Sequence, residues 1–433
     1  MFTERTSVGL DVHARSVVAT AIDGVTGEVF RARLTPNNEQ VVGWVRSLPG
    51  ASVATYEAGP TGFGLARAMA TAQIRCVVAA PSKIRRSAGD RVKTDARDAM
   101  LLARLLRMDE IVAVTVPSVE QEDARDLVRA REDVRGDLMR SRHRVSKLLL
   151  RQGIVYCGGH AWTGAHLVWL RAQHFDTPGL ALAFDAEYEA VLAAEARRDR
   201  LDEAIAAMAA DSQFTPVVHR LGCLRGISTL TSFGLAVEIG DWDRLTGASI
   251  GAYVGLVPTE SSSGQSRSQG SITKTGNTHA RRLLVEAAWH HHKAYRTPGA
   301  TMRARWELAP AAARARGHAG NRRLHERWLR FTERKKRPVV ANVRDRPRAG
   351  WLVLVLGRDG PLTGWAVTRW RPGPGPVLGP PLGSILTGPI ICGCSSASTS
   401  FMLASLRVLH VDSSHAPAGI AQIEECPSVT LTG

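Results

Sequence analysis

The sequence predicts three successive parts: a mixed α/β domain, a long helical segment and a second, mostly helical domain. Over residues 1–117, short apolar strands alternate with stretches of helical spacing. Residues 118–212 carry charged and apolar residues at helical spacing with few breaks, and residues 213–343 contain apolar helices separated by Gly-containing turns. A chain of 433 residues is long enough for two or three such parts with their own hydrophobic cores.

The α/β domain is expected to begin with three strands in hairpin order, because a turn signal, DGVTG, separates two apolar runs at 23–27. Helices and strands then alternate. This order is typical of a mixed sheet with helices on its faces. We expect strands at 7–11, 17–22, 28–34, 51–56, 74–80 and 111–116, and helices at 38–47, 65–72 and 95–108.

The segment 118–212 is expected to form a long, exposed helical hairpin of the coiled-coil type. Its charged pattern is typical of helices that pair with a second chain or lie along nucleic acid, and also of a plain helical spacer. In the domain at 213–343, a Gly turn at 221–228 precedes an apolar helix at 229–239, and its backbone N–H groups would suit a phosphate. Residues 259–276, rich in Ser, Gly and basic residues, are expected to form a long functional or flexible loop.

The charge of the chain indicates a polyanionic partner. The 56 Lys and Arg residues exceed the 40 Asp and Glu residues by 16, and +14 of this charge belongs to residues 1–343. Such an excess is most often found in nucleic-acid-binding proteins, although a GC-rich genome also favours Arg. The candidate phosphate contacts are Arg225, Gly226, Arg267, Lys274, Arg281 and Arg282.

The sequence shows no feature of a membrane or secreted protein. No apolar run reaches the 18 or more residues that a spanning helix needs, and the N-terminus lacks the pattern of a signal peptide. The six cysteines show no zinc-site spacing and are interpreted as reduced thiols. We therefore expect a cytoplasmic protein with no membrane partner.

Four carboxylates occupy positions that suit a metal site. Asp11 ends the first expected strand, Glu57 follows the fourth, and Asp95 and Asp98 lie three residues apart on one helix face. Mg²⁺ and Mn²⁺ prefer oxygen ligands, and a two-metal site needs carboxylates from several elements. The alternative is a set of solvated acids, two of them at the favourable end of a helix dipole. His13 is interpreted as a packed histidine or as a proton-transfer group beside Asp11.

Two sets of motifs resemble one bacterial insertion-sequence transposase family. GLDVH at 9–13, EAGPTG at 57–62 and KTDARDA at 93–99 are similar to its N-terminal DEDD domain, which is RuvC-like with an RNase H-like fold. Five later motifs resemble the family's second, serine-bearing domain and occur in the same order. They are RGIS at 225–228, EIGD at 238–241, YVGLVP at 253–258, SSG at 262–264 and TKTGN at 273–277. The resemblance covers residues 5–343.

The resemblance implies a DNA transposase with two sets of catalytic residues. Asp11, Glu57, Asp95 and Asp98 would bind Mg²⁺ or Mn²⁺. Ser263 would be the nucleophile, with Ser262 as the alternative if the loop differs by one residue; from the residues alone, this stretch is also typical of a Ser/Gly linker. The family's members cut and rejoin DNA at the element ends and the target with the help of an element-encoded guide RNA, which would place this protein at the nucleoid. The charged helices favour a homo-oligomer, a dimer or a tetramer.

Two other functions compete with this one. The first is a RuvC-like, metal-dependent DNA endonuclease without covalent serine catalysis. The second is an inactive nucleic-acid-binding remnant, which residues 344–433 suggest because they are rich in Pro and contain no Lys. A one-base shift in the back-translated codons after Val343 encodes an amphipathic helix. We therefore interpret residues 344–433 as an out-of-frame tail, expected to be disordered, which puts the activity of this chain in question.

Overall fold

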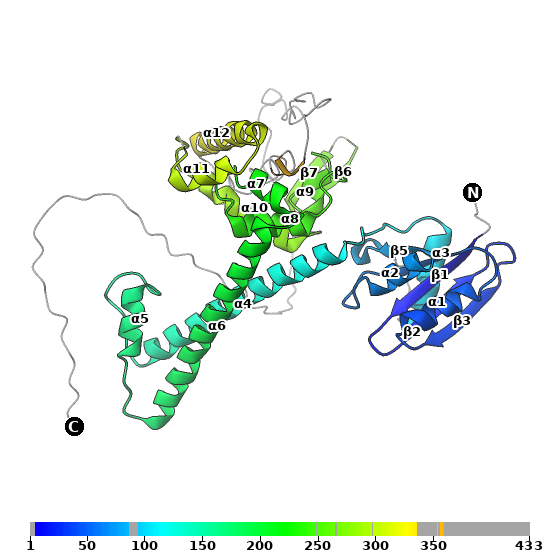
Figure 1. The fold of residues 1–433 in the computed structure, drawn as a ribbon, viewed down its shortest axis with the longest axis horizontal. Helices are drawn as coiled ribbons and strands as arrows, with labels where there is room; N and C mark the ends of the chain where they lie inside the picture. The colour runs from blue at the N-terminus through cyan, green and yellow to red at the C-terminus, as the bar shows by residue number, and fades with distance from the viewer. Residues whose placement is uncertain are drawn as a thin grey trace, which may run out of the picture. The chain divides into compact units, whose positions relative to one another are not determined.

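A computed structural model describes residues 5–85 and 94–335 except 248, 265 and 297, together with 353 and 356–358. The N-terminal part contains one five-stranded sheet in the order β3-β2-β1-β4-β5 (Figure 1). Neighbouring strands from β3 to β1 are antiparallel, whereas β1, β4 and β5 run parallel to one another. The strands are β1 (Thr6–Val12), β2 (Val17–Ile22), β3 (Val29–Leu34), β4 (Ser52–Glu57) and β5 (Arg75–Ala79). The predicted mixed sheet is confirmed.

Helices cover both faces of this sheet. Because side chains alternate along β1, successive residues of this strand face helices on opposite sides of the sheet. Leu10 and its neighbour Tyr56 on β4 are fully buried against α1 (Asn38–Arg46) and α2 (Gly64–Thr71). Gly9 points to the opposite face and lies against the backbone of α3 (Asp95–Arg107). The residues after β5 begin with a short 3₁₀ turn, η1 (Pro81–Lys83).

The prediction of a last strand at 111–116 is wrong. This segment forms one isolated bridge, between Ala79 and Ala113, with backbone bonds from Val114 to Val78 and from Ala80 to Val112. Three apolar residues at alternate positions gave the pattern of a strand, and the segment does run beside β5. Pro117 follows, and because proline has no N–H it cannot continue a ladder.

Two long helices, α4 (Val119–Arg151) and α6 (Pro178–Ala210), form the expected hairpin, with α5 (Gly164–Arg171) near their connection (Figure 1). Their apolar residues pack together around Val145 and Val191. Arg131 forms a two-bonded ion pair with Asp202, at 2.6 and 3.1 Å, and Arg144 pairs with Glu187 at 2.6 Å. The hairpin therefore holds itself together with both apolar contacts and ion pairs.

The remaining part is mostly helical and surrounds a core that includes Leu224, Ile239 and Leu284. Its helices are α7 (Thr215–Leu221), α8 (Thr229–Ile239), α9 (Ser249–Tyr253), α10 (Thr278–Trp289), the 3₁₀ turn η2 (His290–His292), α11 (Ala300–Glu307) and α12 (Ala311–Glu333). Among the described helices, none is both long and apolar enough to cross a membrane.

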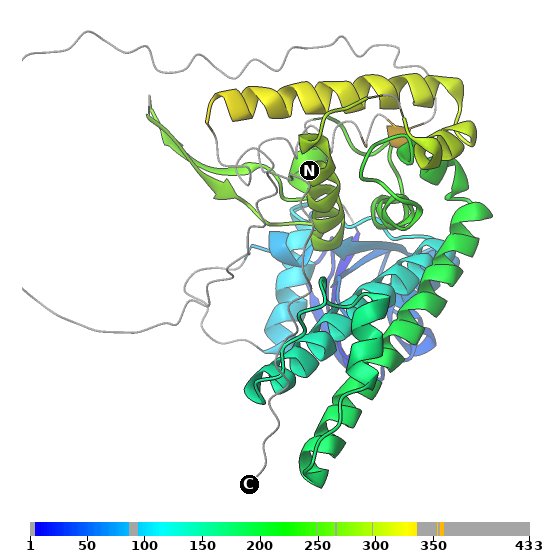
Figure 2. The ribbon, with the colours of Figure 1, turned by 90° about the vertical axis from the view of Figure 1, so that its left-hand side faces the viewer.

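The expected long loop at 259–276 is instead a β-hairpin of β6 (Pro258–Ser263) and β7 (Ser266–Ile272), which extends away from the neighbouring helices in Figure 2. Gly264, with a φ of 56°, makes the turn between the strands. The sequence did not reveal this hairpin because its residues are polar on both faces, so the alternation that normally marks a strand is missing.

A buried carboxylate joins α8 to α4 and α10. Glu238 has no exposed surface, and both of its oxygens accept hydrogen bonds from Arg129, at 3.0 and 3.1 Å. Asn277 donates to it at 2.7 Å, the ring of His279 lies 3.1 Å away, and Arg125 lies at 3.7 Å. Burial opposes ionisation of Glu238, but the hydrogen bonds from His279, Arg129 and Asn277 outweigh it and lower the pKa to about 2. Glu238 is therefore an ion in the folded protein.

The described part of the segment after Val343 packs against this helical core. Val353 and Leu356 are almost completely buried in it. Buried Arg220 donates to the carbonyls of Leu356 and Gly357, at 3.0 and 2.9 Å, and Arg358 donates to three carbonyls between α8 and α9. Packing thus continues beyond the boundary that the sequence suggested, because Val353 and Leu356 supply core side chains. The other residues of the predicted tail lie outside the described residues. The interpretation that residues 344–433 are out of frame stays a prediction.

The Glu238→Gln variant is expected to lose about 3–5 kcal/mol of unfolding free energy at pH 7, because the arginines around residue 238 would keep their charge without a counter-ion. Since the folded-state pKa is lowered, the contribution of Glu238 is present above pH 4.5 and is lost as the pH falls toward 2. Urea unfolding across this pH range measures both effects. Asp137→Asn, which breaks an exposed pair with Arg140, is the control and should cost less than about 1 kcal/mol.

Candidate metal centre and serine hairpin

The carboxylates Asp11 and Glu57 lie at the same edge of the sheet. Leu10 of β1 pairs with Tyr56 of the parallel strand β4, and each acid is the next residue of its strand. Because side chains alternate along a strand, Asp11 points to the same face as Gly9, which is the face covered by α3. The sheet register therefore places the first two predicted acids under the helix that carries the other two.

Gly9 sets the distance between β1 and α3. A Cβ atom at this position would lie 2.1 Å from the carbonyl oxygen of Ala99 and 2.5 Å from the amide nitrogen of Ala103. Only glycine permits this approach of strand and helix backbones. The N-terminus of α3 is fixed at Thr94, whose side chain accepts a hydrogen bond from the amide of Arg97. These two contacts bring the first turn of α3 to the end of β1.

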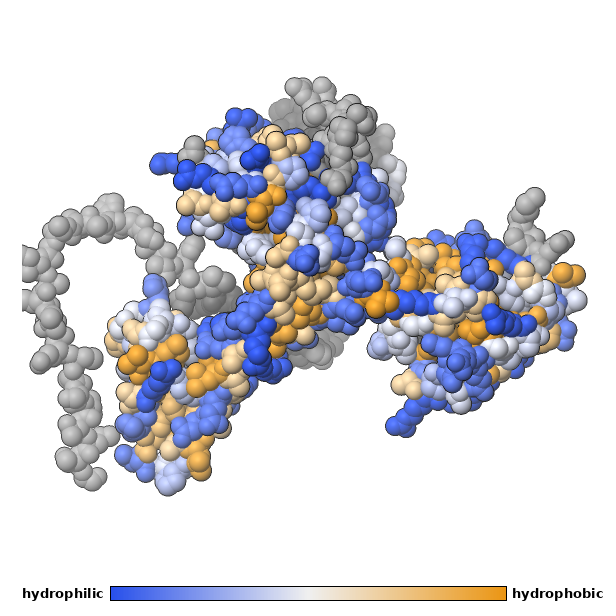
Figure 3. All heavy atoms as spheres, viewed as in Figure 1, coloured by the Kyte–Doolittle hydropathy of each residue, from blue (hydrophilic) through white to orange (hydrophobic). Residues whose placement is uncertain are grey.

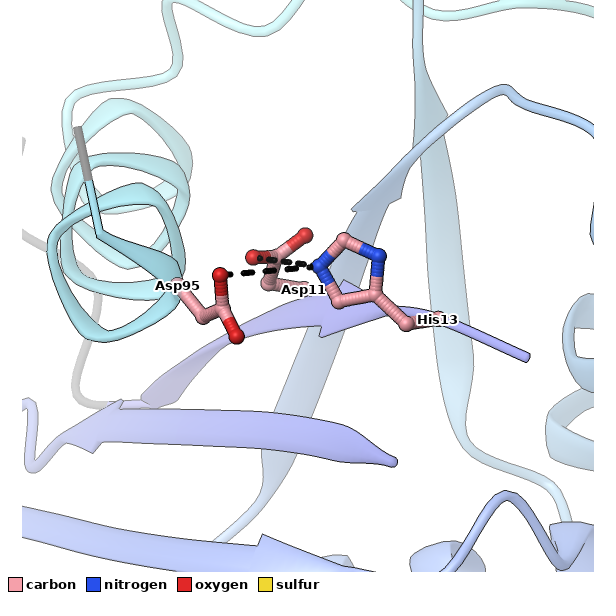
Figure 4. A group of neighbouring side chains, drawn as sticks. All are labelled: Asp11, His13 and Asp95. Carbon is pink, nitrogen blue, oxygen red and sulfur yellow. Dashed lines mark hydrogen bonds and ion pairs between the residues drawn. The ribbon is translucent and has the colours of Figure 1, made fainter. Parts of the chain in front are cut away.

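Three of the candidate ligand groups converge at this point (Figure 4). Nε2 of His13 lies 3.1 Å from Oδ2 of Asp11 and 3.8 Å from Oδ1 of Asp95. One ligand atom from each of the three residues lies within 4.8 Å of the others. The side chain of Asp11 is 18% exposed, whereas those of His13 and Asp95 are about half exposed. The group thus has one sheltered carboxylate and two open to solvent.

The electrostatic surroundings of Asp11 favour a cation. Burial raises the pKa of Asp11 above its ordinary value; His13 lowers it, and the charges of Asp95 and Asp98 raise it again. Three carboxylates near one another repel, and a divalent ion would relieve this repulsion while accepting their oxygens as ligands. The residues present therefore fit the divalent metal that the predicted site requires.

The predicted four-acid set is only partly gathered. Within the described residues, Glu57 and Asp98 fall outside the trio that lies within 4.8 Å, although Asp98 is close enough to affect the pKa of Asp11. His13 belongs to the trio, although the sequence alone indicated only a packed histidine or a proton-transfer group and not a metal ligand. Its position two residues after Asp11, at the end of the same strand, was the signal that could have included it.

Gly9→Ala is expected to destabilise the protein by about 1–3 kcal/mol or more, because the new methyl group must push α3 away from β1. The same movement would shift Asp95 away from Asp11 and weaken metal binding. Denaturant unfolding and titration with Mn²⁺ measure the two effects. Gly43→Ala is the matched control: nothing lies within 4 Å of a Cβ there, and in helix α1 the change should stabilise by about 0.5–1 kcal/mol.

Without divalent metal, Asp11→Asn is expected to melt at a higher temperature than the unchanged protein at pH 7. A raised folded-state pKa means that the ionised carboxyl destabilises the fold once the pH exceeds its ordinary value, and asparagine removes that charge. Added Mg²⁺ or Mn²⁺ should raise the melting temperature of the unchanged protein and have little effect on the variant. Glu110→Gln, beyond the other end of α3, should respond like the unchanged protein. A melting temperature that ignores both metals would contradict the metal site.

The candidate serines lie in the exposed strand β6. Ser262 and Ser263 point to opposite faces of the hairpin, since they are adjacent in a strand. The hydroxyl of Ser262 donates to Oε1 of Glu260 at 3.0 Å, and Gln269 of β7 donates to Oε2 at 3.1 Å. Ser263 pairs with Ser266 next to the turn. Both serines are therefore open to solvent, and Ser262 alone of the two is shown in contact with a carboxylate, that of Glu260.

Two glycines hold the base of this hairpin. A Cβ at Gly255 would lie 2.1 Å from the carbonyl oxygen of Thr275, and one at Gly276 would lie 2.0 Å from that of Tyr253. The stretches before β6 and after β7 therefore contact each other through their backbones. Arg281 donates to the carbonyls of Val254 and Thr275, at 3.0 and 2.9 Å, and closes the same contact. The motifs YVGLVP and TKTGN are thus neighbours in space.

The predicted phosphate contacts occupy varied surroundings. Arg225 donates to the carbonyls of residues 293 and 294, and Arg282 pairs with Glu132 and Glu286. At Gly226 a Cβ would lie 2.6 Å from the carbonyl oxygen of Ala287, so this glycine permits close packing on α10. Lys274 is exposed. The side chain of Arg267 is not among those that the structure describes. Arg225 and Arg282 therefore make contacts that stabilise the fold.

Known families match both halves of the chain. Residues 8–153 match a family described as "Transposase" (DEDD_Tnp_IS110), and residues 218–307 match the "Transposase IS116/IS110/IS902 family". The first match spans the sheet and α3, and the second spans the serine hairpin and the helices around it. A DEDD transposase domain implies a divalent metal, in agreement with the trio at the sheet edge.

Individual proteins match over most of their length. The chain is 35% identical to a "Putative transposase y4qE" of Sinorhizobium fredii (strain NBRC 101917 / NGR234), over 84% of this chain and 88% of that protein. It is 30% identical to the "Transposase for insertion sequence element IS1533" of Leptospira borgpetersenii, over 76% of this chain and 97% of that protein. With both domain matches in the same order, the chain belongs to the IS116/IS110/IS902 family of transposases.

Proposed function

We propose that this protein is a DNA recombinase of an insertion sequence, which cuts and rejoins DNA with a metal-dependent acidic site and a serine nucleophile. The observation that carries the proposal is the convergence of Asp11, His13 and Asp95 at the sheet edge, in a chain whose second family match contains an exposed serine hairpin. Its substrates would be the element ends and a target DNA. The alternative without covalent chemistry is a metal-dependent endonuclease.

The acidic residues would hold the metal and position the phosphate. Asp11 and Asp95 offer carboxylate oxygens, with Glu57 at the same sheet edge and Asp98 on the same helix turn. A bound Mg²⁺ or Mn²⁺ would supply charge stabilisation for the phosphate oxygens during cleavage. His13, half exposed and 3.1 Å from Asp11, would either join the metal ligands through Nε2 or act as a proton-transfer group when Nε2 is not bound to metal.

The serine would form a temporary bond to DNA. Its Oγ attacks the phosphorus, the P–Oγ bond forms, and the bond from phosphorus to one deoxyribose oxygen breaks. The hydroxyl proton passes to a neighbouring base, and the departing oxygen takes up a proton. The reverse reaction, with the hydroxyl of another DNA end, rejoins the strands without an external energy source. The resemblance supports Ser263 as the nucleophile, and the contact with Glu260 supports Ser262.

Three finer features also belong to the proposal. The N-terminal domain would have a RuvC-like, RNase H-like fold, which agrees with the mixed sheet and the acids at its edge. A guide RNA and a homo-oligomer are supported by the resemblance and, for the oligomer, by the long hairpin of α4 and α6. The predicted domain boundaries at 117, 212 and 343 stay part of this proposal.

A covalent adduct tests the proposed chemistry. The full chain, incubated with duplex DNA carrying the element ends, its RNA and Mg²⁺, is expected to give a protein–DNA adduct that survives denaturation. Replacing the nucleophile, Ser263→Ala or Ser262→Ala, should abolish the adduct, and mass spectrometry of the linked peptide identifies which serine carries it. Ser261→Ala is the matched control in the same strand and should keep the adduct.

The contact between Glu260 and Ser262 allows a test of whether Glu260 is the general base that accepts the proton of the serine. If Glu260 accepts the proton, Glu260→Gln should slow adduct formation by about 10²-fold, as expected for loss of a general base. Free DNA ends in the absence of any adduct would replace the recombinase with the metal-dependent endonuclease. Inactivity of the chain that is reversed by restoring the alternative reading frame after Val343 would identify it as a remnant.

A further inference from the structure

Lys274, at the base of the serine hairpin, has a backbone conformation that lysine rarely adopts. Its φ is 55°, in the left-handed region, which the Cβ atom of most residues makes unfavourable. Three of the other described non-glycine residues with positive φ directly follow the C-terminal cap of a helix, where this conformation is common. They are Gln73, Asp109 and Lys335. Lys274 lies between β7 and α10 instead, so the end of a helix does not explain its conformation.

Backbone contacts hold Lys274 in this conformation. Its amide donates to the carbonyl of Gly255 at 3.1 Å, and the amide of Thr273 donates to the carbonyl of Val257 at 2.9 Å. On the other side of Lys274, the carbonyl oxygen of Thr275 lies 2.1 Å from the place that a Cβ at Gly255 would take. Lys274 therefore cannot leave the left-handed region without separating the two stretches that form the base of the hairpin.

The side chain of Lys274 does not compensate for this strain. The residue is exposed, and within the part of the chain that the structure describes its ammonium group has neither a hydrogen bond nor an ion pair. Arg281 and Arg282 of α10, in contrast, contact carbonyls and carboxylates of the chain itself. Glycine at position 274 would keep the backbone contacts and remove the strain. A lysine is thus unfavourable for the fold here, and strain of this kind is typical of functional sites.

The surface around Lys274 favours a phosphate as the partner of its charge. Apart from Pro258 and Ile272, the strands β6 and β7 contain no apolar side chain, and in Figure 3 blue and pale residues gather over them. The centre of a protein–protein interface is usually apolar, and this hairpin offers no such centre. The single acid of the two strands, Glu260, already accepts two hydrogen bonds. A cation without a partner in the chain, beside a polar hairpin, suits a phosphodiester.

The hairpin limits how far from the serines Lys274 can act. Ser263 pairs with Ser266 beside the turn, and Lys274 follows Ser266 by eight residues. An extended strand rises about 3.4 Å per residue, so the backbone of Lys274 lies at most about 27 Å from this end of the hairpin. That length corresponds to about eight base pairs of duplex DNA at about 3.4 Å each. A phosphate bound by Lys274 would therefore belong to the same DNA segment as the bond that the serine attacks.

We propose that Lys274 binds a phosphate of the DNA segment that the serine attacks, and that its strained backbone fixes this cation at the base of the hairpin. The inference rests on the proposed function and adds to it a residue that positions the DNA, outside the acidic site and the serines. Because an ammonium group on a phosphate reads no base, the contact is independent of base sequence. It sets the position of the DNA relative to Ser262 and Ser263.

Replacing the lysine by glycine separates its role in binding from any role in the fold. Lys274→Gly should melt at the same or a higher temperature than the unchanged chain, because it removes the strain. Without divalent metal, it should bind a labelled duplex of about 30 base pairs several-fold more weakly at about 100 mM salt. The slope of log K against log salt should fall by about 1, since one phosphate contact is lost. Lys274→Arg keeps the charge and should bind nearly as well as the unchanged chain.

A methylphosphonate, which removes the charge of one phosphate, locates the contact. Placed in turn along a duplex carrying an element end, it should weaken binding by the unchanged chain at a position within about eight base pairs of the cleaved bond. At that position it should weaken binding by Lys274→Gly no further, because the contact is already lost. Equal further weakening of both proteins at every position overturns the contact.

Two controls match the two changes that Lys274→Gly makes. Gln73→Gly replaces another exposed left-handed residue, and Lys147→Ala removes one exposed charge from α4. Both should leave affinity and slope nearly unchanged.

Equal binding of duplex DNA by Lys274→Gly and the unchanged chain overturns the proposed contact. A lower melting temperature of Lys274→Gly also overturns it, because the lysine side chain would then serve the fold. The same holds if only single-stranded DNA or RNA responds to the variant. These results leave the recombinase proposal intact, whereas failure of the unchanged chain to bind duplex DNA at any salt concentration contradicts the recombinase proposal itself.

Discussion

The buried carboxylate of Glu238 connects the helices on which the second half of the structure depends. It belongs to α8, receives two hydrogen bonds from Arg129 of α4 and one from Asn277, the residue that caps α10. A charge without exposed surface is tolerated only where several donors compensate for the lost hydration. A rearrangement of α4 relative to α8 would separate Glu238 from its arginine donors, and a movement of α10 would remove the hydrogen bond from Asn277. These contacts stabilise the observed arrangement of the three helices and, through α10, the segment that closes the base of the serine hairpin.

A different constraint, steric in origin, builds the acidic site. The absence of a side chain at Gly9 lets the backbone of α3 approach β1, so the first turn of the helix reaches the end of the strand. Asp95 of the helix and Asp11 of the strand then both face Nε2 of His13. Burial is the main cause that raises the pKa of Asp11, and the charges of Asp95 and Asp98, which this approach brings near, raise it further. A site that binds a divalent cation needs such a concentration of negative charge, which is unfavourable for the fold alone.

The distribution of charge differs between the helices, and many arginines serve the structure of the chain itself. In α4, arginines pair with acids of the same chain and stabilise the hairpin. Arg281 and Arg225 contact backbone carbonyls at bends. In α12, the basic residues far exceed the acids. A count of arginines in a sequence segment therefore predicts little about nucleic-acid binding, whereas net charge per segment and the partners of each guanidinium predict much more.

The sequence by itself determined the strands β1 to β5, the long helices and the acids at the strand ends, because apolar periodicity and local turn chemistry depend on neighbouring residues. It did not determine the hairpin β6–β7, whose polar strands pair through the backbone, or the absence of a strand at 111–116, where a ladder does not form beyond one bridge. Only the tertiary structure decided that His13 joins Asp11 and Asp95 while Glu57 lies outside that trio, and that Arg281 supports the hairpin base. These outcomes depend on distances between residues far apart in the chain, and such distances follow from register, close backbone approach and buried charge rather than from local pattern.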